Sequence, residues 1–350
     1  MALNDALAQL SGMTLDLSFQ ETSNKNYQVL QSYRNTTSYS ILSELHSCPR
    51  KYQLIKARAA SGSSGNNNVD FAYGHAVGAG VQAWLATGDL DKAILNCVLA
   101  WNIGFFAEVE KKKKSIWNAI VAVQKYVEFS QASMEDWEVW KAPNGKDAIE
   151  LSISIDFENG FKHYIHIDVI LVNKLTGQLA VQENKTSGFL NIEEAIYANS
   201  NQALSYACVV DMLSDDTSFE VFYCVYSSTS REWNLLPFTK RTALKAEWIT
   251  DVRLDHATIA TYNDLNFYPK RGESCFTFMR RCEFFGSCNL TSNLQVPSVL
   301  PADKEAERVD YAFKLSDMIA RQHSLNQTEP VNADSNATNI LGGNFENIDY

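Results

Sequence analysis

The sequence predicts a mixed α/β domain with a mixed sheet flanked by helices. Before about residue 135, apolar residues recur at every third or fourth position, which is typical of amphipathic helices. From Trp137 onward the apolar period changes to two, which is typical of strands. Beyond about residue 190, helical and strand patterns alternate, so helices are available to cover the sheet.

Length and composition allow one large domain or two small ones. The chain has 350 residues, 45% of them hydrophobic, which is ample for a packed core. We expect an N-terminal arm over 1–37, a main domain over 38–298 and an acidic polar tail over 299–350, with arm and tail partly disordered. Residues 301–350 carry 4 basic and 9 acidic side chains, a net charge of −5 that suits a solvated tail.

The front half predicts helices with recognisable ends. Ser38 or Ser40 can cap a helix that Pro49 kinks or restarts, and the run at 61–68 has the composition of a flexible loop. A helical pair follows from Phe71, broken at Thr87–Asp89, where Gly88 ends one helix and Asp89 caps the next. A further helix is expected from about 115 to 130.

The second half predicts a meander of strands. Turns at Asn144–Gly145 and Asn159–Gly160 separate period-two runs, and a β-hairpin follows over Tyr164–Gly188 with its turn at Lys174–Gln178. After it we expect a helix at 192–213, strands at 219–228 and 232–238, a helix at 242–262 and a helical patch at 302–322.

The hairpin carries the chemistry. Because side chains alternate along a strand, Asp168 on one arm and Glu183 and Lys185 on the other can converge. Carboxylate oxygens bind divalent metals, and an ammonium group beside them suits phosphodiester hydrolysis. On its own, Glu-x-Lys is more often a solvated salt bridge.

The next helix adds Gln202 and Tyr206, four residues apart on one face. Asp168, the run Glu183–Lys185 and Gln202-x-x-x-Tyr206 together resemble the PD-(D/E)XK nuclease superfamily, in its RecB-like branch. The resemblance covers about 38–290 and implies a restriction-endonuclease-like core with helical elaboration. It also implies that Gln202 and Tyr206 help to hold DNA near the site.

The resemblance implies Mg²⁺ or Mn²⁺ held by Asp168, Glu183 and the Asn184 carbonyl, with Lys185 orienting a water or stabilising charge at phosphorus. The branch has a Gly-x-x-x-His helix whose histidine is a further ligand. Here Gly74 begins that pattern, but its last position is Gly78. His75 and Gln82, seven residues apart on nearly the same helix face, are the candidate replacements, as direct ligands or through water. For His75 the alternative is a structural role.

Cysteines give a second, independent indication. Cys97, Cys208 and Cys224 fall in apolar patterns and are expected in the core. One upstream and three downstream cysteines resemble the iron–sulfur variety of these nucleases, the AddB-like and CRISPR-associated RecB-like exonucleases: Cys48, Cys275, Cys282 and Cys288. The family's downstream spacing would place a cysteine at Met279. Four thiolates suit a [4Fe–4S] cluster joining the two ends of the domain, with Zn²⁺ as the alternative.

These features together predict a metal-dependent DNA exonuclease, acting in recombination or repair of a phage or mobile element. Its expected partners are DNA ends and a recombination protein. The alternatives are a non-catalytic DNA-end or partner-binding protein on the same fold, or an endonuclease. The net charge of −11 confines DNA contact to a local basic groove and bound metal. No membrane span or signal peptide is evident, so a cytoplasmic protein, in the bacterial host if phage-encoded, is expected.

Overall fold

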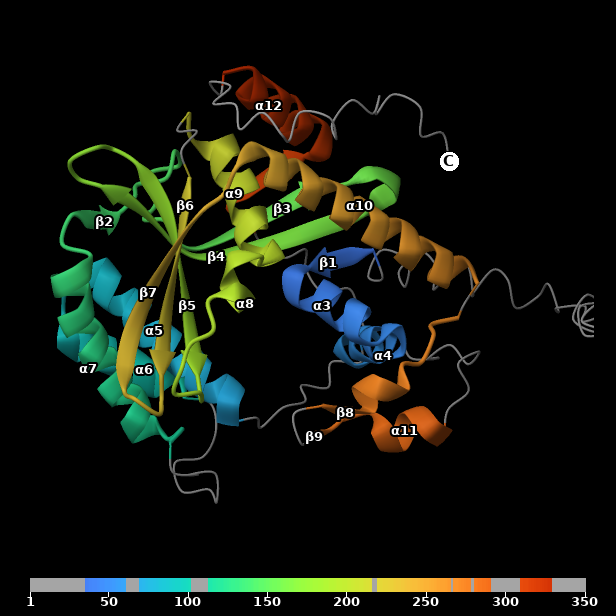
Figure 1. Cartoon of the computed structure of the whole chain (residues 1–350), viewed down its shortest axis with the longest axis horizontal. Helices are drawn as coiled ribbons and strands as arrows, with labels where there is room; N and C mark the ends of the chain where they lie inside the picture. Colours follow the sequence, from blue (N-terminus) through green and yellow to red (C-terminus); the bar gives the residue numbers. More distant parts are fainter. Residues whose placement is uncertain are drawn as a thin grey trace, which may run out of the picture.

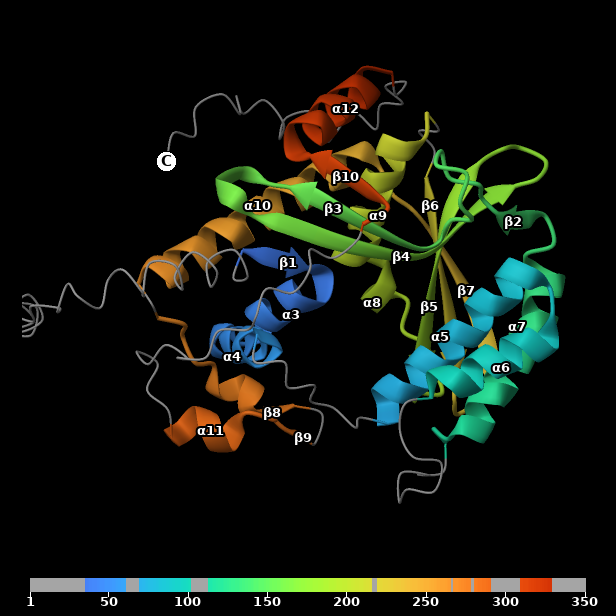
Figure 2. The same cartoon turned by 180° about the vertical axis from the view of Figure 1, so that it is seen from behind.

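The computed structural model describes residues 35–60, 69–101, 113–215, 219–265, 267–277, 280–290 and 309–328. A mixed sheet crosses the molecule and carries helices on both faces (Figures 1 and 2). Its strands in the described ranges are β1 (Thr36–Ser38), β2 (Trp137–Val139), β3 (Ile149–Asp156), β4 (Lys162–Asn173), β5 (Leu179–Ser187), β6 (Glu220–Ser227), β7 (Glu232–Thr239) and β10 (Tyr311–Lys314). The expected mixed α/β architecture is therefore confirmed.

The sheet has the order β10-β3-β4-β5-β6-β7, with β1 and β2 also paired to β4. Strands β3, β4 and β5 form an antiparallel meander, as the period-two pattern predicts. Strand β6 then runs parallel to β5, because the helix between them carries the chain back across the sheet.

Helices of the front half are α3 (Tyr39–Ser47), α4 (Pro49–Ala60), α5 (Val69–Thr87), α6 (Leu90–Ala100) and α7 (Ile116–Ser133). Ser38 occupies the N-cap of α3 but makes no side-chain capping hydrogen bond, whereas the other expected ends follow their signals. Asp89 accepts hydrogen bonds from the backbone of Asp91 and Lys92, and Gly88 has a φ of 63° that favours glycine. Pro49 restarts the chain as the first residue of α4.

The second set is α8 (Ala195–Ala198), α9 (Asn201–Leu213), α10 (Thr242–Asp264) and α12 (Leu315–Thr328). The helix expected from 192 to 213 is thus split into a single turn and a longer helix. A separate small unit contains β8 (Phe276–Thr277), β9 (Arg280–Arg281) and α11 (Phe285–Leu290), next to α4 in both views (Figures 1 and 2).

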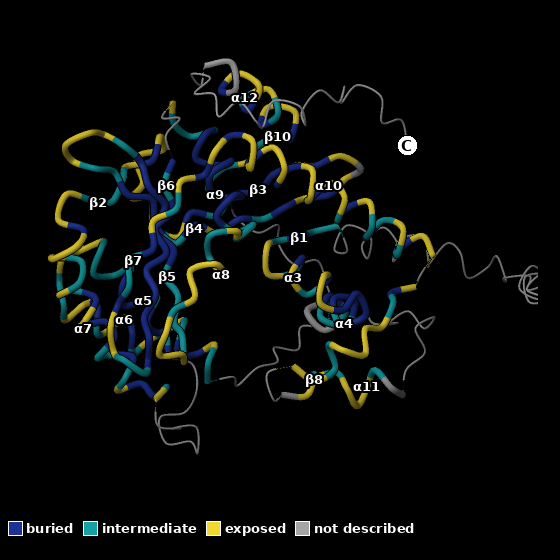
Figure 3. The backbone as a smooth tube through the Cα atoms, viewed as in Figure 1, coloured by how far each residue is buried: buried dark blue, intermediate teal, exposed yellow. Residues whose placement is uncertain are grey.

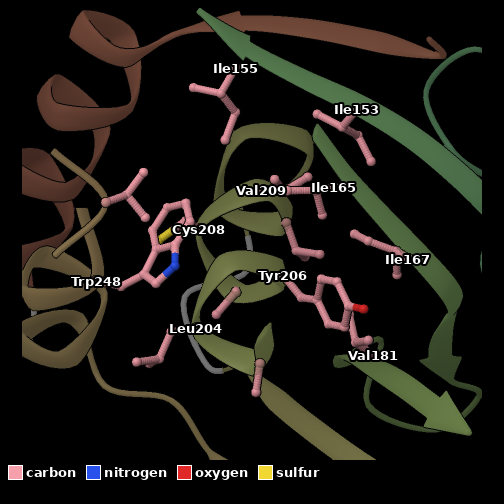
Figure 4. Packing of buried hydrophobic residues seen from close by; sticks show 14 of the residues in the cluster. Ile153, Ile155, Ile165, Ile167, Val181, Leu204, Tyr206, Cys208, Val209 and Trp248 are labelled. Carbon is pink, nitrogen blue, oxygen red and sulfur yellow. The ribbon is translucent and has the colours of Figure 1, made fainter. Parts of the chain in front are cut away.

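The sheet separates two hydrophobic cores. Helices α9, α10 and α12 pack on one face, where Ile153, Ile165 and Ile167 meet Tyr206 and Trp248 (Figure 4). Helices α5, α6 and α7 cover the other face, around Tyr73, Val123 and Phe222. The burial pattern follows this division, with the strands the most continuously buried part (Figure 3).

Two boundaries differ from expectation. Strand β1 crosses the predicted boundary between the arm (1–37) and the main domain, and its residues Thr36–Ser38 pair in parallel with β4. Residues 309–328, assigned to the acidic tail, form β10 and α12: β10 pairs in parallel with β3, and Leu315 and Met318 are buried in the core. Pairing with a distant strand outweighs the polar composition of this segment. Residues 1–34, 301–308 and 329–350 lie outside the described residues.

None of the described helices is long and apolar enough to cross a membrane.

Candidate active site

A fork in the sheet brings the predicted hairpin residues together. In the described pairing, β4 meets β5 only where Val169–Val172 face Leu179–Gln182. Before Val169, β4 pairs with β3, and beyond Gln182, β5 pairs with β6. Asp168 and Glu183 are the first residues past the point of separation, and the Asn184 backbone N–H donates to Asp168 Oδ2 at 2.9 Å. The opening between the strands therefore has two carboxylates at its base.

Glu183 is buried, and donors surround its carboxylate. Lys185 Nζ lies 2.5 Å from Oε1, to which Gln202 Nε2 also donates at 2.9 Å. Tyr206 donates its hydroxyl proton to Oε2 at 2.9 Å. All three donors are predicted site residues, and with Glu183 they form one connected network.

Lys185 presents its ammonium group at the edge of this network. Its side chain is 36% exposed, and Gln202 Oε1 accepts a second hydrogen bond from Nζ at 3.0 Å. Burial lowers the pKa of Lys185, but the charges of Glu183 and Asp168 outweigh that effect and raise it overall. The lysine is therefore a fixed positive charge and cannot act as a base near neutral pH.

The pKa of Asp168 is raised by its surroundings in the fork. Burial and then the charge of Glu183 raise the pKa of Asp168 well above its ordinary value, despite the hydrogen bond from Asn184 and the charge of Lys185. Two carboxylates pressed together in this way suit a divalent cation, since hard oxygen ligands and negative charge are what Mg²⁺ and Mn²⁺ require. The donor set thus fits the implied metal, although no group of three or more His, Cys, Asp or Glu in ligand geometry occurs among the described residues.

Glu150 is a site residue that the sequence motifs missed. The register places it directly opposite Asp168, between the pairs Ile149–Val169 and Leu151–Ile167. Its charge also raises the pKa of Asp168. Like charges directly opposite one another destabilise a sheet, and Glu150 has a φ of 51°, in the left-handed region. Its carboxylate accepts a hydrogen bond from Gln82 of α5. The sequence does predict the strand that carries Glu150. Only the register between that strand and β4 shows that Glu150 lies opposite Asp168.

Gln202 and Tyr206 lie on α9 beneath the fork, and Figure 4 shows the Tyr206 hydroxyl extending from the packed core. Tyr206 is buried, and Gln202 Nε2 donates to its hydroxyl at 2.5 Å. The Tyr206 hydroxyl contacts Glu183 and Gln202, and the role in holding DNA that the resemblance implies for Gln202 and Tyr206 stays a prediction. In this geometry the pair orients Glu183 and Lys185.

The structure does not bring His75 to the carboxylates. Its ring is exposed, and Nδ1 donates to the Ala100 carbonyl at the end of α6 at 3.1 Å. Gly78, at the position where the resembling pattern has its histidine, has open space where a Cβ would be. This contact gives no support to a ligand role for His75, which stays a prediction, whereas Gln82, the other candidate on α5, contacts Glu150.

Asn184 faces the opposite side of β5 from Glu183, as the period of two requires. Its Oδ1 accepts from Gln182 Nε2 at 2.8 Å, and Tyr126 donates its hydroxyl proton to Gln182 Oε1 at 2.9 Å. Asn184 Nδ2 is buried with no hydrogen-bond partner among the described residues. The predicted ligand role of its carbonyl stays a prediction.

The four singled-out cysteines come from distant parts of the chain to one place. Cys48 lies between α3 and α4, and Ser274 donates its hydroxyl proton to the neighbouring Ser47 carbonyl at 2.6 Å. Partial burial and then the charges of Cys282, Cys48 and Cys288 raise the pKa of Cys275. The Cys282 N–H donates to the Cys275 carbonyl at 2.9 Å. Cys97, Cys208 and Cys224 are fully buried, which confirms their predicted core positions. Met279 lies outside the described residues.

Comparisons with known proteins give little further guidance. No protein-family model matches the chain, and no curated protein matches its sequence. A crystal structure from Eubacterium rectale, described as "Putative exonuclease", is 13% identical with a TM-score of 0.47, covering 82% of this chain and 97% of that one. The crystal structure of SSO0001 is 15% identical with a TM-score of 0.27, covering 70% of this chain and 86% of that one. At these scores neither similarity carries weight for the function.

Proposed function

We propose that the protein is a metal-dependent DNA nuclease whose active site is the fork between β4 and β5. One observation carries this proposal: Asp168 and Glu183 meet where the strands separate, with the Lys185 ammonium 2.5 Å from Glu183. The three groups supply two hard oxygen ligands and one fixed cation, which is the set that phosphodiester hydrolysis uses.

The topology around the fork supports the resemblance to PD-(D/E)XK nucleases. A three-stranded antiparallel meander, β3 to β5, is followed by α9 and the parallel strand β6. The first acid lies on the middle strand of the meander, and the acid-x-lysine lies on its third strand. This order matches the arrangement that the sequence motifs imply.

Each residue has a defined part in the chemistry. Asp168 and Glu183 would hold Mg²⁺ or Mn²⁺, which would supply positive charge at the scissile phosphate and lower the pKa of a bound water. Gln202 and Tyr206 keep the Glu183 carboxylate in one orientation. Lys185 stays protonated and stabilises negative charge that develops on the phosphoryl oxygens as the P–O bond to water forms and the ester P–O bond breaks.

The direct test is hydrolysis of end-labelled linear DNA with Mg²⁺ or Mn²⁺, compared with the variant Lys185→Ala. We expect loss of hydrolysis in the variant and in wild type treated with chelator, with circular dichroism unchanged. Undiminished hydrolysis by Lys185→Ala would overturn the assignment. We propose that the enzyme is an exonuclease, which needs a DNA end and should leave closed circles intact. A circular substrate therefore distinguishes it from an endonuclease, which would cut the circle.

We further propose a role in recombination or repair for a phage or mobile element, in the cytoplasm of its host. The basis is sequence alone: the chain carries this single nuclease constellation and lacks the G-x-x-x-x-G-K-[ST] motif of helicases. A recombination protein as partner is part of the same proposal. Co-purification from host cells during infection tests it.

For the cysteines we propose a [4Fe–4S] cluster, with Zn²⁺ as the alternative. The hydrogen bonds from Ser274 to the Ser47 carbonyl and from the Cys282 N–H to the Cys275 carbonyl bring the two ends of the domain together beside these cysteines, which supports the proposal of four-thiolate binding. Anaerobically purified protein should be brown and lose its visible absorbance in Cys282→Ser. A colourless protein that contains zinc would exclude the iron–sulfur assignment.

A second candidate is a DNA-end-binding protein without catalysis. Two observations favour it: Gly78 supplies no side chain where the resembling pattern has a ligand, and the described residues hold no three-ligand metal group. It predicts DNA binding that does not change with Mn²⁺ and no heat of Mn²⁺ binding that depends on Asp168 or Glu183. Calorimetric titration of Mn²⁺ into wild type and Asp168→Asn decides between the two.

A further inference from the structure

Two aromatic side chains stand in solvent just beyond the catalytic strand. Phe189 lies four residues after Lys185 and is 70% exposed, and Phe71 in the first turn of α5 is 68% exposed. Four residues of extended chain span about 13 Å, so Phe189 is within reach of a strand bound at the fork. Single exposed apolar residues are common on protein surfaces. Phe71 and Phe189 differ from such isolated residues because the backbone around Phe189 is held by hydrogen bonds and a lysine lies beside it.

The backbone that presents Phe189 is held on both sides. Its N–H donates to Ser187 Oγ at 3.1 Å, and Ser227 donates its hydroxyl proton to the Phe189 carbonyl at 2.6 Å. Thr229 donates to the Gly188 carbonyl at 2.7 Å, and the Ser228 N–H donates to the Ser187 carbonyl at 2.9 Å. The turn between β6 and β7 thus fixes a chain segment whose aromatic side chain remains in water.

The start of α5 lies beside this segment. A Cβ on Gly74 would meet Thr186 Oγ1 at 3.5 Å, so the helix passes close to the end of β5. Phe71 precedes Gly74 by three residues and lies on the same side of the helix. In both views the first turns of α5 are next to the end of β5 (Figures 1 and 2).

Positive charge accompanies the aromatic pair. Lys113 Nζ donates to Thr229 Oγ1 at 3.0 Å, and that hydroxyl in turn donates to the carbonyl before Phe189. The neighbouring Lys114 is paired with Asp70 at 2.7 Å, so the charge that the segment offers to DNA comes from Lys113. Lysines beside exposed aromatic rings are the combination with which proteins bind single-stranded nucleic acid.

On the basis of the proposed nuclease function, we propose that Phe71, Lys113 and Phe189 form a ledge on which bases of a single-stranded DNA end stack next to the fork. The faces of bases are accessible in a single strand and covered in a duplex. A chain of net charge −11 gains little from general attraction to phosphates, so stacking has to supply much of its affinity. The ledge therefore favours a single-stranded end over a blunt duplex.

The test is equilibrium binding of fluorescein-labelled oligonucleotides, followed by fluorescence anisotropy with Ca²⁺ in place of Mg²⁺ so that the DNA stays intact. We expect Phe189→Ala to weaken binding of a single-stranded 15-mer by about 5- to 100-fold, as one lost stacking contact would. Binding of a blunt hairpin duplex should change by less than twofold. Phe189→Trp should restore the single-strand affinity, because indole offers an equal stacking surface.

The matched control is Leu175→Ala, which removes an exposed apolar side chain, 78% accessible, from the turn at the opposite end of β5. It should bind both oligonucleotides as wild type does. Wild-type affinity in Phe189→Ala, an equal loss for duplex and single strand, or tighter binding of the matching RNA would each overturn the ledge. Binding without hydrolysis by wild type would reject the nuclease and leave the ledge standing. Hydrolysis by wild type, together with equal DNA affinity in wild type and Phe189→Ala, would support the nuclease and reject the ledge.

Discussion

Glu183 is the most constrained side chain of the fork. It is buried, and three donors on two elements occupy its two carboxylate oxygens: Lys185, Gln202 and Tyr206. A group held in this way has its orientation fixed before substrate arrives, which is how protein sites lower the reorganisation needed for reaction. The predicted motif residues thus act as one unit at this carboxylate.

Glu150 should contribute to the same site through its charge. We expect Glu150→Gln to weaken activation of hydrolysis by Mg²⁺, raising the half-activating concentration by about tenfold, since one of three neighbouring carboxylates is lost. Titration of activity with Mg²⁺ measures this.

Gln82→Ala is the matched comparison for Glu150. It removes the hydrogen bond to Glu150 and keeps the carboxylate, so activation by Mg²⁺ should shift much less. Equal activation curves for wild type and Glu150→Gln would show that this carboxylate plays no part.

The hairpin acids could be predicted because a period of two assigns each residue to a face without knowledge of the rest of the fold. Glu150 could not, since its place opposite Asp168 depends on the register between β3 and β4. His75 illustrates the limit of a motif transferred by sequence: its spacing is near the expected one, but its ring bonds to Ala100.

Among the elements, α9 and α10 are joined by a buried ion pair between Asp211 and Lys245. Nζ lies 2.5 Å from Oδ2, and both side chains are almost inaccessible. Gln322 of α12 donates to the same oxygen at 2.6 Å. Burial raises the pKa of Asp211 in spite of Lys245. The three helices behind the fork therefore meet at one carboxylate.

Lys245→Met should lower the free energy of unfolding by about 3–5 kcal/mol, because it leaves a buried carboxylate without its cation. Urea denaturation followed by circular dichroism measures the loss. The double variant Asp211→Asn with Lys245→Met removes both charges and should recover a large part of the stability. Additive losses in the double variant would mean that the pair is not coupled.

Local signals predicted most helices well and missed the strands β1, β8, β9 and β10. Ser115, Gly88 and Asp89 mark helix ends through contacts within a few residues, so their roles are legible along the chain. Strands β1 and β10 pair in parallel with β4 and β3, more than a hundred residues away. Strand β1 is too short to show a period, and β10 lies inside the helical patch expected at 302–322, whose helix begins only at Leu315. Pairing within the completed sheet gives both segments their extended structure.

At the scale of the whole molecule, a buried histidine pair joins three elements. Thr37 Oγ1 of β1 lies 3.0 Å from His163 Nδ1 of β4 and 2.8 Å from His256 Nε2 of α10. Phe161 stacks on the His256 ring at 4.4 Å between centroids. Burial lowers the pKa of each histidine to about 3, with the charge of His256 also acting on His163.

Stability should therefore fall in acid. The unfolded histidines have pKa values of about 6.5, so below that pH the unfolded state binds more protons than the native state. The contribution is complete above about pH 6.5 and is lost as the pH falls toward about 3. Melting temperatures of wild type from pH 8 to pH 5 should show the decline.

His256→Gln is the control variant for this effect. Its amide can keep the hydrogen bond to Thr37 and does not titrate, so its melting temperature should decline less between pH 8 and pH 5. Identical slopes for variant and wild type would exclude His256 as a source of acid sensitivity.

If the fork is the active site, replacing Asp168 should abolish cleavage without lowering the stability of the protein. Asp168 is half-buried beside Glu183 and Glu150, and its partial burial and these like charges raise its pKa, so neutralising it should cost the fold little. The measurement is the rate of single-turnover cleavage of labelled linear DNA, with melting temperature, for wild type and Asp168→Asn. We predict cleavage slower by about a thousandfold or more, at an equal or higher melting temperature. Cleavage at the wild-type rate in Asp168→Asn would contradict the assignment of the fork as the active site.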